Sequence, residues 1–164
     1  EIYTVNDSIE LIKTYGSLFN KEVQATNLCE KIELKLSKFQ VYIQSKSKLK
    51  IAYFIWKDPW MVAANNTYIN HLLYTNKYTN YYEHLERYPE VSIENIDSKE
   101  LDVIFLSSEP FPFSDKHISE IKNIHQNTKI ILVDGEMFSW HGSRLIKAFD
   151  YFIELRESIR KLSV

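Results

Sequence analysis

The stretch that decides the fold is Leu49-Lys50-Ile51-Ala52-Tyr53-Phe54-Ile55-Trp56. Every residue in it except the lysine is apolar, and strands that are buried on both faces of a parallel sheet have this composition. Two further runs of the same kind follow, at residues 101–106 and 129–133, and segments with helical periodicity separate the three runs. This alternation predicts an α/β fold, in which a mainly parallel sheet is covered by helices on both faces as a three-layer α/β/α arrangement.

The segment that precedes this strand is predicted to be one long helix. Residues 20–45 contain neither Gly nor Pro, and their apolar residues recur at a roughly helical spacing. A helix of that length measures about 35–40 Å, which is long for a small domain and indicates a strut between two bodies. A shorter helix is expected over residues 6–16. We therefore divide the chain into residues 1–45, with a short helix and a long backbone helix, and residues 46–164, an α/β lobe.

Large apolar side chains cluster at the ends of the three predicted strands. In open parallel sheets, ligands bind beyond the carboxyl ends of the strands, and the loops there usually carry polar residues. These aromatic residues therefore form a platform for a ligand or a partner protein, or they fold back and seal the end of the sheet. Both alternatives remain open at this point. The residues concerned are Trp56, Trp60, Phe111, Phe113, Met137 and Trp140.

Composition and motif spacing argue against several classes of function. The net charge is -2 and no basic stripe is present, so the chain lacks the basic surface that is typical of a nucleic-acid-binding protein. With three Gly in the chain, no phosphate-binding loop follows any strand. Cys29 is expected to be a buried structural thiol, and His117 and His125 to be solvated residues of one helix. No apolar run is long enough to cross a membrane, and no catalytic, metal or cofactor site is predicted.

Three segments carry a resemblance to a known family. Residues 53–61 with 66–69 are similar to a strand, aromatic loop and helix of class III periplasmic-type binding proteins, which serve importers of cobalamin, haem and iron siderophores. The stretch Arg87-Tyr88-Pro89-Glu90-Val91-Ser92-Ile93-Glu94 resembles the aromatic–Pro–x–Val–Ser–x–Glu pattern of the cobalamin binders. Residues 102–113 with 130–144 are similar to the family's last two strands and their cleft loops. The resemblance covers roughly residues 1–162.

The resemblance implies a two-lobed protein in which a long helix joins the lobes and the ligand lies between them. This chain then corresponds to the C-terminal half, with the N-terminal lobe absent. Its abrupt apolar start, without an initiator Met, suggests the interior of a longer protein. Glu94 matches a surface Glu that cobalamin binders present to the transporter permease. The residues matching the wall of the cleft are Trp56, Trp60, Tyr88, Phe111, Phe113, Met137, Trp140 and Arg144.

The function implied by this resemblance is the substrate-binding component of an ABC importer for a metal chelate. It carries no enzymatic activity and no cofactor, and its partners are the chelate and the permease. The implied location is periplasmic or at the cell surface, peripheral to the membrane through the permease or a lipid anchor of the full-length protein. Self-association through the exposed cleft edge is also expected. The alternative is an α/β protein-interaction or regulatory domain that uses an exposed aromatic edge.

Overall fold

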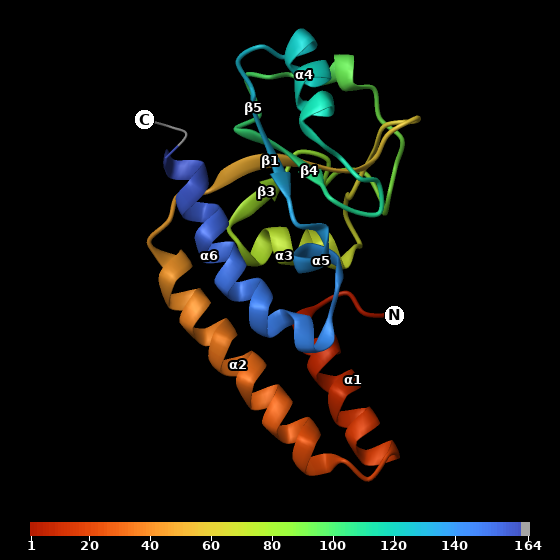
Figure 1. The fold of residues 1–164 in the computed structure, drawn as a ribbon, viewed down its shortest axis with the longest axis vertical. Coiled ribbons are helices and arrows are strands. Elements are labelled where there is room, and N and C mark those ends of the chain that lie inside the picture. Colours follow the sequence, from red (N-terminus) through yellow and green to blue (C-terminus); the bar gives the residue numbers. More distant parts are fainter. Residues whose placement is uncertain (162–164) are drawn as a thin grey trace. The chain divides into compact units, whose positions relative to one another are not determined.

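The computed structural model describes residues 1–161, and their contacts divide the chain into two compact units. One unit is Ser47–Phe138, and the other combines Glu1–Lys46 with the chain from Ser139 on. We refer to them as the sheet unit and the helical unit. Figure 1 shows the elements of each unit, coloured along the sequence.

The sheet unit is built on a mainly parallel five-stranded sheet, which confirms the predicted fold class. β1 (Leu49–Trp56) is paired in parallel with β3 (Tyr78–Asn80) and β4 (Val103–Ser107), and β4 is paired in parallel with β5 (Lys129–Val133). The short β2 (Met61–Val62) lies antiparallel to β1. The predicted bounds of β1 and β5 agree with the structure, whereas β4 begins two residues later than expected.

Helices cover both faces of this sheet, as the burial of alternate strand residues requires. On one face, Ala52 and Phe54 of β1 pack in a core cluster with Ile121 of α4 (Asp115–Ile124). On the other, the Tyr53 ring lies 5.1 Å from that of Phe138 in α5 (Gly135–Ser139). α3 (Tyr68–Thr75) lies on this second side with α5 (Figure 1). A short 3-10 helix, η1 (Ile93–Asn95), precedes β4.

One strand differs from its prediction. β5 was expected to be buried on both faces, but only Val133 of its five residues is fully buried and Leu132 is exposed. The reason is its position at the edge of the described sheet, where β4 is its neighbour. An apolar run therefore correctly predicts that this segment is a strand, but it does not show whether the strand is central or at the edge of the sheet.

The helical unit contains α1 (Val5–Leu18), α2 (Glu22–Gln44), the 3-10 helix η2 (Gly142–Arg144) and α6 (Leu145–Lys161). α2 is a single helix of 23 residues, so the prediction of one long helix over residues 20–45 is confirmed. Its Phe39 is fully buried and its ring lies 5.7 Å from that of Phe149 in α6. α1 begins earlier than expected because Thr4 accepts a hydrogen bond from the Asp7 N–H and caps it.

Two further features of the helices bear on the predictions. Cys29 is buried in α2, as expected for a structural thiol. Within residues 1–161, no helix combines the length and the apolar character needed to cross a bilayer.

Candidate functional site

Four aromatic side chains gather at the carboxyl ends of β1 and β4. Trp56 ends β1 and Trp60 lies in the loop after it, while Phe111 and Phe113 lie in the loop after β4. We call these four residues the aromatic edge. The backbone N–H of Phe111 donates to the carbonyl of Ile55 at 3.3 Å, which ties the second loop to the end of β1. The parallel pairing of β1 and β4 brings these two loops together, as expected.

The rings of the aromatic edge form a continuous chain of contacts. Trp56 packs edge-on against Phe111, with centroids 5.5 Å apart, and Phe111 lies 4.7 Å from Phe113. Phe113 in turn stacks on Trp60 at 6.0 Å with nearly parallel rings. Edge-to-face and offset contacts of this kind stabilise an arrangement beyond the apolar area that they bury. The edge is therefore held as one unit.

Exposure differs along the aromatic edge. Trp56 has 38% of its surface exposed, and Trp60 and Phe111 are half-buried. Phe113 is only 6% exposed, so it is not open to solvent as the platform alternative requires of these residues. It is buried because it belongs to the core cluster, against which Trp60 and Phe111 pack. Each of the two alternatives therefore holds for a different residue. Phe113 seals the end of the sheet, whereas Trp56 presents an apolar face to solvent.

Charged residues support the aromatic edge from one side. Lys57 forms an ion pair of 2.8 Å with Glu120 of α4, and its ammonium lies 5.5 Å from the centroid of Trp60. The hydrogen bond from this ammonium to Glu120 raises the pKa of Lys57. His117 and His125, predicted to be solvated, are both buried. The prediction is wrong because other segments cover these side chains: the rings of Phe111 and Phe113 pack on His117, and the Ile93 carbonyl lies 2.7 Å from His125.

A hollow of about 640 Å³ opens at the carboxyl ends of β4 and β5. Gly135 permits its construction, because a Cβ there would lie 2.4 Å from the Ser107 Oγ and 2.6 Å from the Glu109 Cγ. The Ser107 hydroxyl donates to the Glu109 carbonyl at 2.6 Å, and the Gly135 N–H donates to the Ser108 Oγ at 3.0 Å. The hollow is lined by Ser108, Glu109, Phe113, Leu132, Val133, Asp134 and Glu136.

The polar lining of this hollow was not predicted. The available signal was the pair of acids that flank Gly135 directly after a strand, since strand ends of parallel sheets are where ligands bind. Ser108 and Glu109 gave no comparable signal, because their position depends on the turn after β4. Within residues 1–161, no group of three or more His, Cys, Asp or Glu side chains is arranged to hold a metal ion.

The remaining predicted wall residues lie on other segments. Tyr88 is exposed in a loop whose backbone is fixed by the hydrogen bond from the Ala64 N–H to the Arg87 carbonyl at 2.8 Å. Met137 is half-buried in α5. Trp140 and Arg144 belong to the helical unit, where the guanidinium lies 5.1 Å from the centroid of the 48% exposed Trp140 ring. That these four residues belong to one wall of a ligand cleft stays a prediction.

Glu94 is exposed on η1 and lies on a well-anchored loop. The Ser92 hydroxyl donates to its carboxylate at 2.5 Å, and this hydrogen bond lowers the pKa of Glu94. Beneath it, the imidazole of His125 lies 2.7 Å from the Ile93 carbonyl through Nε2 and 2.6 Å from the Ser98 hydroxyl through Nδ1. A carbonyl can only accept, so Nε2 carries the proton. Glu94 is thus an ionised carboxylate on a rigid support.

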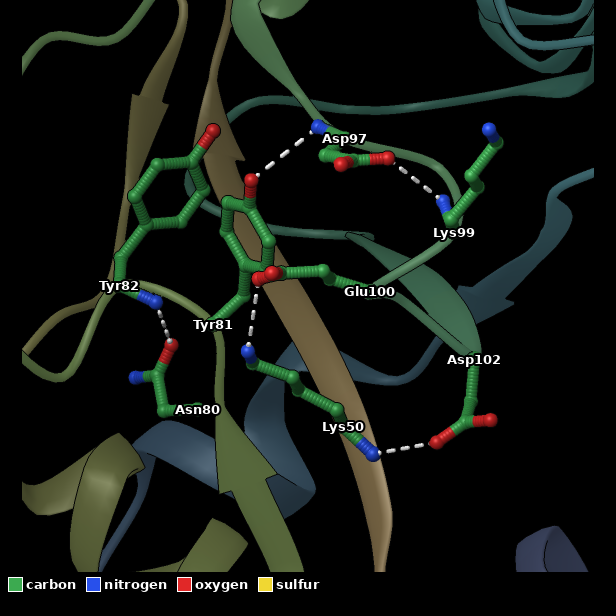
Figure 2. A network of polar contacts seen from close by, with 8 residues as sticks. All are labelled: Lys50, Asn80, Tyr81, Tyr82, Asp97, Lys99, Glu100 and Asp102. Atoms are coloured by element: carbon green, nitrogen blue, oxygen red, sulfur yellow. Dashed lines mark hydrogen bonds and ion pairs between the residues drawn. The ribbon is translucent and has the colours of Figure 1, made fainter.

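The other end of this loop is held by the polar contacts drawn in Figure 2. The N–H of Asp97 donates to the Tyr81 hydroxyl at 3.1 Å, and the N–H of Lys50 donates to the Asp102 carboxylate at 2.6 Å. The Lys50 ammonium also lies 5.2 Å from the centroid of the Tyr81 ring and 3.2 Å from the Glu100 carboxylate. These contacts join residues 97–102 to β1 and to the segment after β3.

The chain matches a known family model and several solved structures. A family model described as periplasmic binding protein matches residues 3–129 of the chain. No curated protein matches the chain at a significant level. Among solved structures, the chain is similar to a possible iron-binding, periplasmic solute-binding protein from Staphylococcus epidermidis. The TM-score is 0.79 and the identity 20%, and the match covers 97% of this chain and 64% of that protein.

Two further structures show the same likeness. The periplasmic vitamin B12 binding protein BtuF of Vibrio cholerae matches 98% of this chain with 64% of its own, at a TM-score of 0.79 and 15% identity. The periplasmic heme-binding protein RhuT from a Roseiflexus species matches 95% of this chain with 64% of its own, at 0.80 and 13%. The chain thus spans 64% of the length of each of these proteins. Identities this low establish the fold alone, and the three proteins are described as binders of different ligands.

Proposed function

Since this chain belongs to the periplasmic binding protein family, a non-enzymatic family of substrate-binding proteins, we propose that it is the substrate-binding part of an ABC importer for a metal chelate. The chelate is cobalamin, haem or a ferric siderophore, and this chain supplies one wall of the cleft that holds it. The family implies a location outside the cytoplasm, and we propose the periplasm or the cell surface.

The observation that carries the proposal is the exposed aromatic edge at the carboxyl ends of β1 and β4. Trp56 presents an apolar face to solvent, and the ring contact to Phe111 holds it in place. Large planar or macrocyclic chelates are held mainly by apolar contact, with a few polar groups to orient them. The hollow beside the edge supplies such groups through Ser108, Glu109 and Asp134. Its acids favour a ligand with hydrogen-bond donors or positive charge on that side.

The proposed wall consists of residues that contact the ligand and residues that support them. Trp56 and Phe111 contact the ligand from the aromatic edge, and Trp60 contacts it with the solvent-exposed part of its side chain. Phe113 is buried and acts as the layer on which Trp60 stacks. We propose contact roles also for Tyr88, Met137, Trp140 and Arg144.

We propose that Glu94 contacts the permease and takes no part in ligand binding. Its carboxylate is exposed and ionised, and its loop is anchored through His125 and through Tyr81. A rigid surface carboxylate suits docking to a basic partner, because electrostatic complementarity sets the orientation of association.

The proposal is tested by titrating the protein with haemin, cobalamin and a ferric siderophore and following the absorbance of each chelate. We expect saturable binding of one of the three. One wall alone gives weak binding: losing about 150 Å² of contact at about 25 cal/mol per Å² lowers affinity by about 4 kcal/mol, or about a thousandfold. A longer protein that adds a second lobe should recover this difference. If none of the three chelates binds either protein, the chelate proposal is wrong and a protein-interaction role takes its place.

A further inference from the structure

We propose that His117 is a positioning residue of the aromatic edge: as a neutral hydrogen-bond acceptor it holds the loop of Phe111 and Phe113, and its protonation releases that loop. The affinity of the aromatic edge for its ligand is then high at neutral pH and low in acid. The inference rests on the proposed function for its ligand, but the structural switch itself requires no ligand.

The first support is the place of the imidazole beneath the loop. His117 is 4% exposed, and its ring meets Phe111 edge-on at 5.3 Å and Phe113 edge-on at 5.4 Å. These are the two rings through which Trp56 and Trp60 are joined. A movement of this imidazole therefore displaces the centre of the aromatic edge rather than its rim.

The second support is the direction of the hydrogen bond at its Nδ1. The backbone N–H of Ser114, at the end of the aromatic loop, donates to this nitrogen at 3.0 Å. An N–H can only donate, so the Nδ1 of His117 must be unprotonated. In the imidazolium both ring nitrogens carry protons, so the Ser114 N–H and the Nδ1 proton would face each other, and the ring would have to turn towards the Ser114 hydroxyl, which lies 3.3 Å from Nδ1. Protonation thus removes the side-chain contact between the end of the loop and the first turn of α4, where the backbone bond from the His117 N–H to the Ser114 carbonyl at 2.9 Å remains.

The third support is the charge around the ring. Burial lowers the pKa of His117, and the ammonium groups of Lys116 on α4 and Lys57 on the loop after β1 lower it further. Glu120 on α4 and a backbone hydrogen bond with Ser114 act in the opposite direction and raise the pKa, but the net shift is downward. The imidazole is therefore neutral at pH 7, in the state that the geometry requires. Because the pKa lies below its usual value of 6.5, the stabilisation is present above pH 6.5 and is lost as the pH falls below it.

The same turn of α4 also holds the other loop. Glu120 follows His117 by one helical turn and forms the 2.8 Å ion pair with Lys57, whose ammonium lies 5.5 Å from the Trp60 centroid. One face of α4 therefore contacts both halves of the aromatic edge. The loop after β1 is held to α4 by this ion pair, whereas the loop after β4 is held to α4 by the imidazole and to β1 by the backbone bond from Phe111 to Ile55.

The test uses the fluorescence of Trp56 and Trp60 in the absence of any ligand. In a Trp140→Phe background these are the tryptophans that remain of the three in the chain. Lowering the pH from neutrality should shift the emission to longer wavelength in one transition, with its midpoint below pH 6.5. In His117→Asn, the side-chain amide oxygen can accept from Ser114 but does not titrate, so the transition should disappear. His84→Asn, which changes an exposed histidine, should retain it.

Circular dichroism over the same pH range separates loop release from unfolding, since α-helical content should stay constant through the transition. A transition that persists in His117→Asn, or the absence of any transition while the protein remains folded, overturns the proposal. If His117→Asn does not fold, the ¹⁵N shifts of the imidazole in the unmutated protein decide. Nδ1 must then be unprotonated at pH 7, and a proton on Nδ1 refutes the mechanism. Because no chelate is used, failure here leaves the proposed function to its own test.

Discussion

Replacing Trp56 by alanine should weaken chelate binding in proportion to the area of this side chain that is open to a ligand. The side chain is 38% exposed, and a Trp side chain offers up to about 250 Å², so about 95 Å² is open to a ligand. At about 25 cal/mol per Å², complete coverage of that area contributes about 2.4 kcal/mol and half coverage about 1.2 kcal/mol. The dissociation constant should therefore rise by about 7- to 50-fold. The rest of the side chain, about 155 Å², is buried against residues such as Phe111, so the free energy of unfolding should also fall, by up to about 4 kcal/mol.

The assay follows the absorbance of haemin, cobalamin or the ferric siderophore that binds, because the substitution removes a fluorophore. Urea denaturation of both proteins supplies the change in stability. Tyr74→Ala is the matched control, since Tyr74 is an even more exposed aromatic residue on α3, away from the carboxyl ends of the strands. It should leave the dissociation constant unchanged. Equal losses of affinity in Trp56→Ala and Tyr74→Ala, or no loss in either, would refute the assignment of the ligand to the aromatic edge.

Three other substitutions probe the remaining features. Glu94→Ala should leave the chelate dissociation constant unchanged and reduce uptake by cells whose importer depends on this protein; loss of chelate binding itself would contradict the docking role. Gly135→Ala should lower the free energy of unfolding by about 1–3 kcal/mol in urea, because the new methyl group overlaps the side chains of Ser107 and Glu109. Glu157 has a pKa lowered to about 2 by hydrogen bonds from a lysine and a tyrosine, so its contribution to stability is present above pH 4.5 and is lost as the pH falls towards 2. Glu157→Gln should reduce the slope of stability against pH in that range, and an unchanged slope would show that this carboxylate contributes nothing.

Local sequence patterns predicted the elements of the fold well where one cause dominates. β1 was recognised with its bounds because a buried central strand must be apolar on both faces and Pro59 lies shortly beyond it. α2 was recognised because 23 residues without Gly or Pro leave little alternative to a helix. β5 was recognised as a strand, but its exposure was not, since edge position depends on which strands pair.

The candidate site was less predictable, because it is made by loops that fold back on the sheet. The position of Trp56 follows from the end of a strand, and its exposed face agrees with the platform alternative. Phe113 and His117 bury each other, because their rings are in contact with centroids 5.4 Å apart. The pattern of apolar residues within α4 cannot predict this burial, because the covering side chain comes from a loop. The lining by Glu109 likewise requires the close approach of Gly135, a tertiary contact.

The parallel pairing of β1 has a consequence for the growing chain. Ile51 is paired with Val103, which lies about 50 residues further along, so β1 has no central partner when it leaves the ribosome. At about 5–20 residues per second, β4 follows only after roughly 3–10 s. During that interval the apolar residues 51–55, which are all buried in the finished protein, are open to other chains. Non-local pairing of this kind also slows folding afterwards, because the intervening loop must be closed before the contact stabilises it. The strand that organises the sheet is therefore also a segment whose apolar surface stays uncovered while the rest of the lobe is being synthesised.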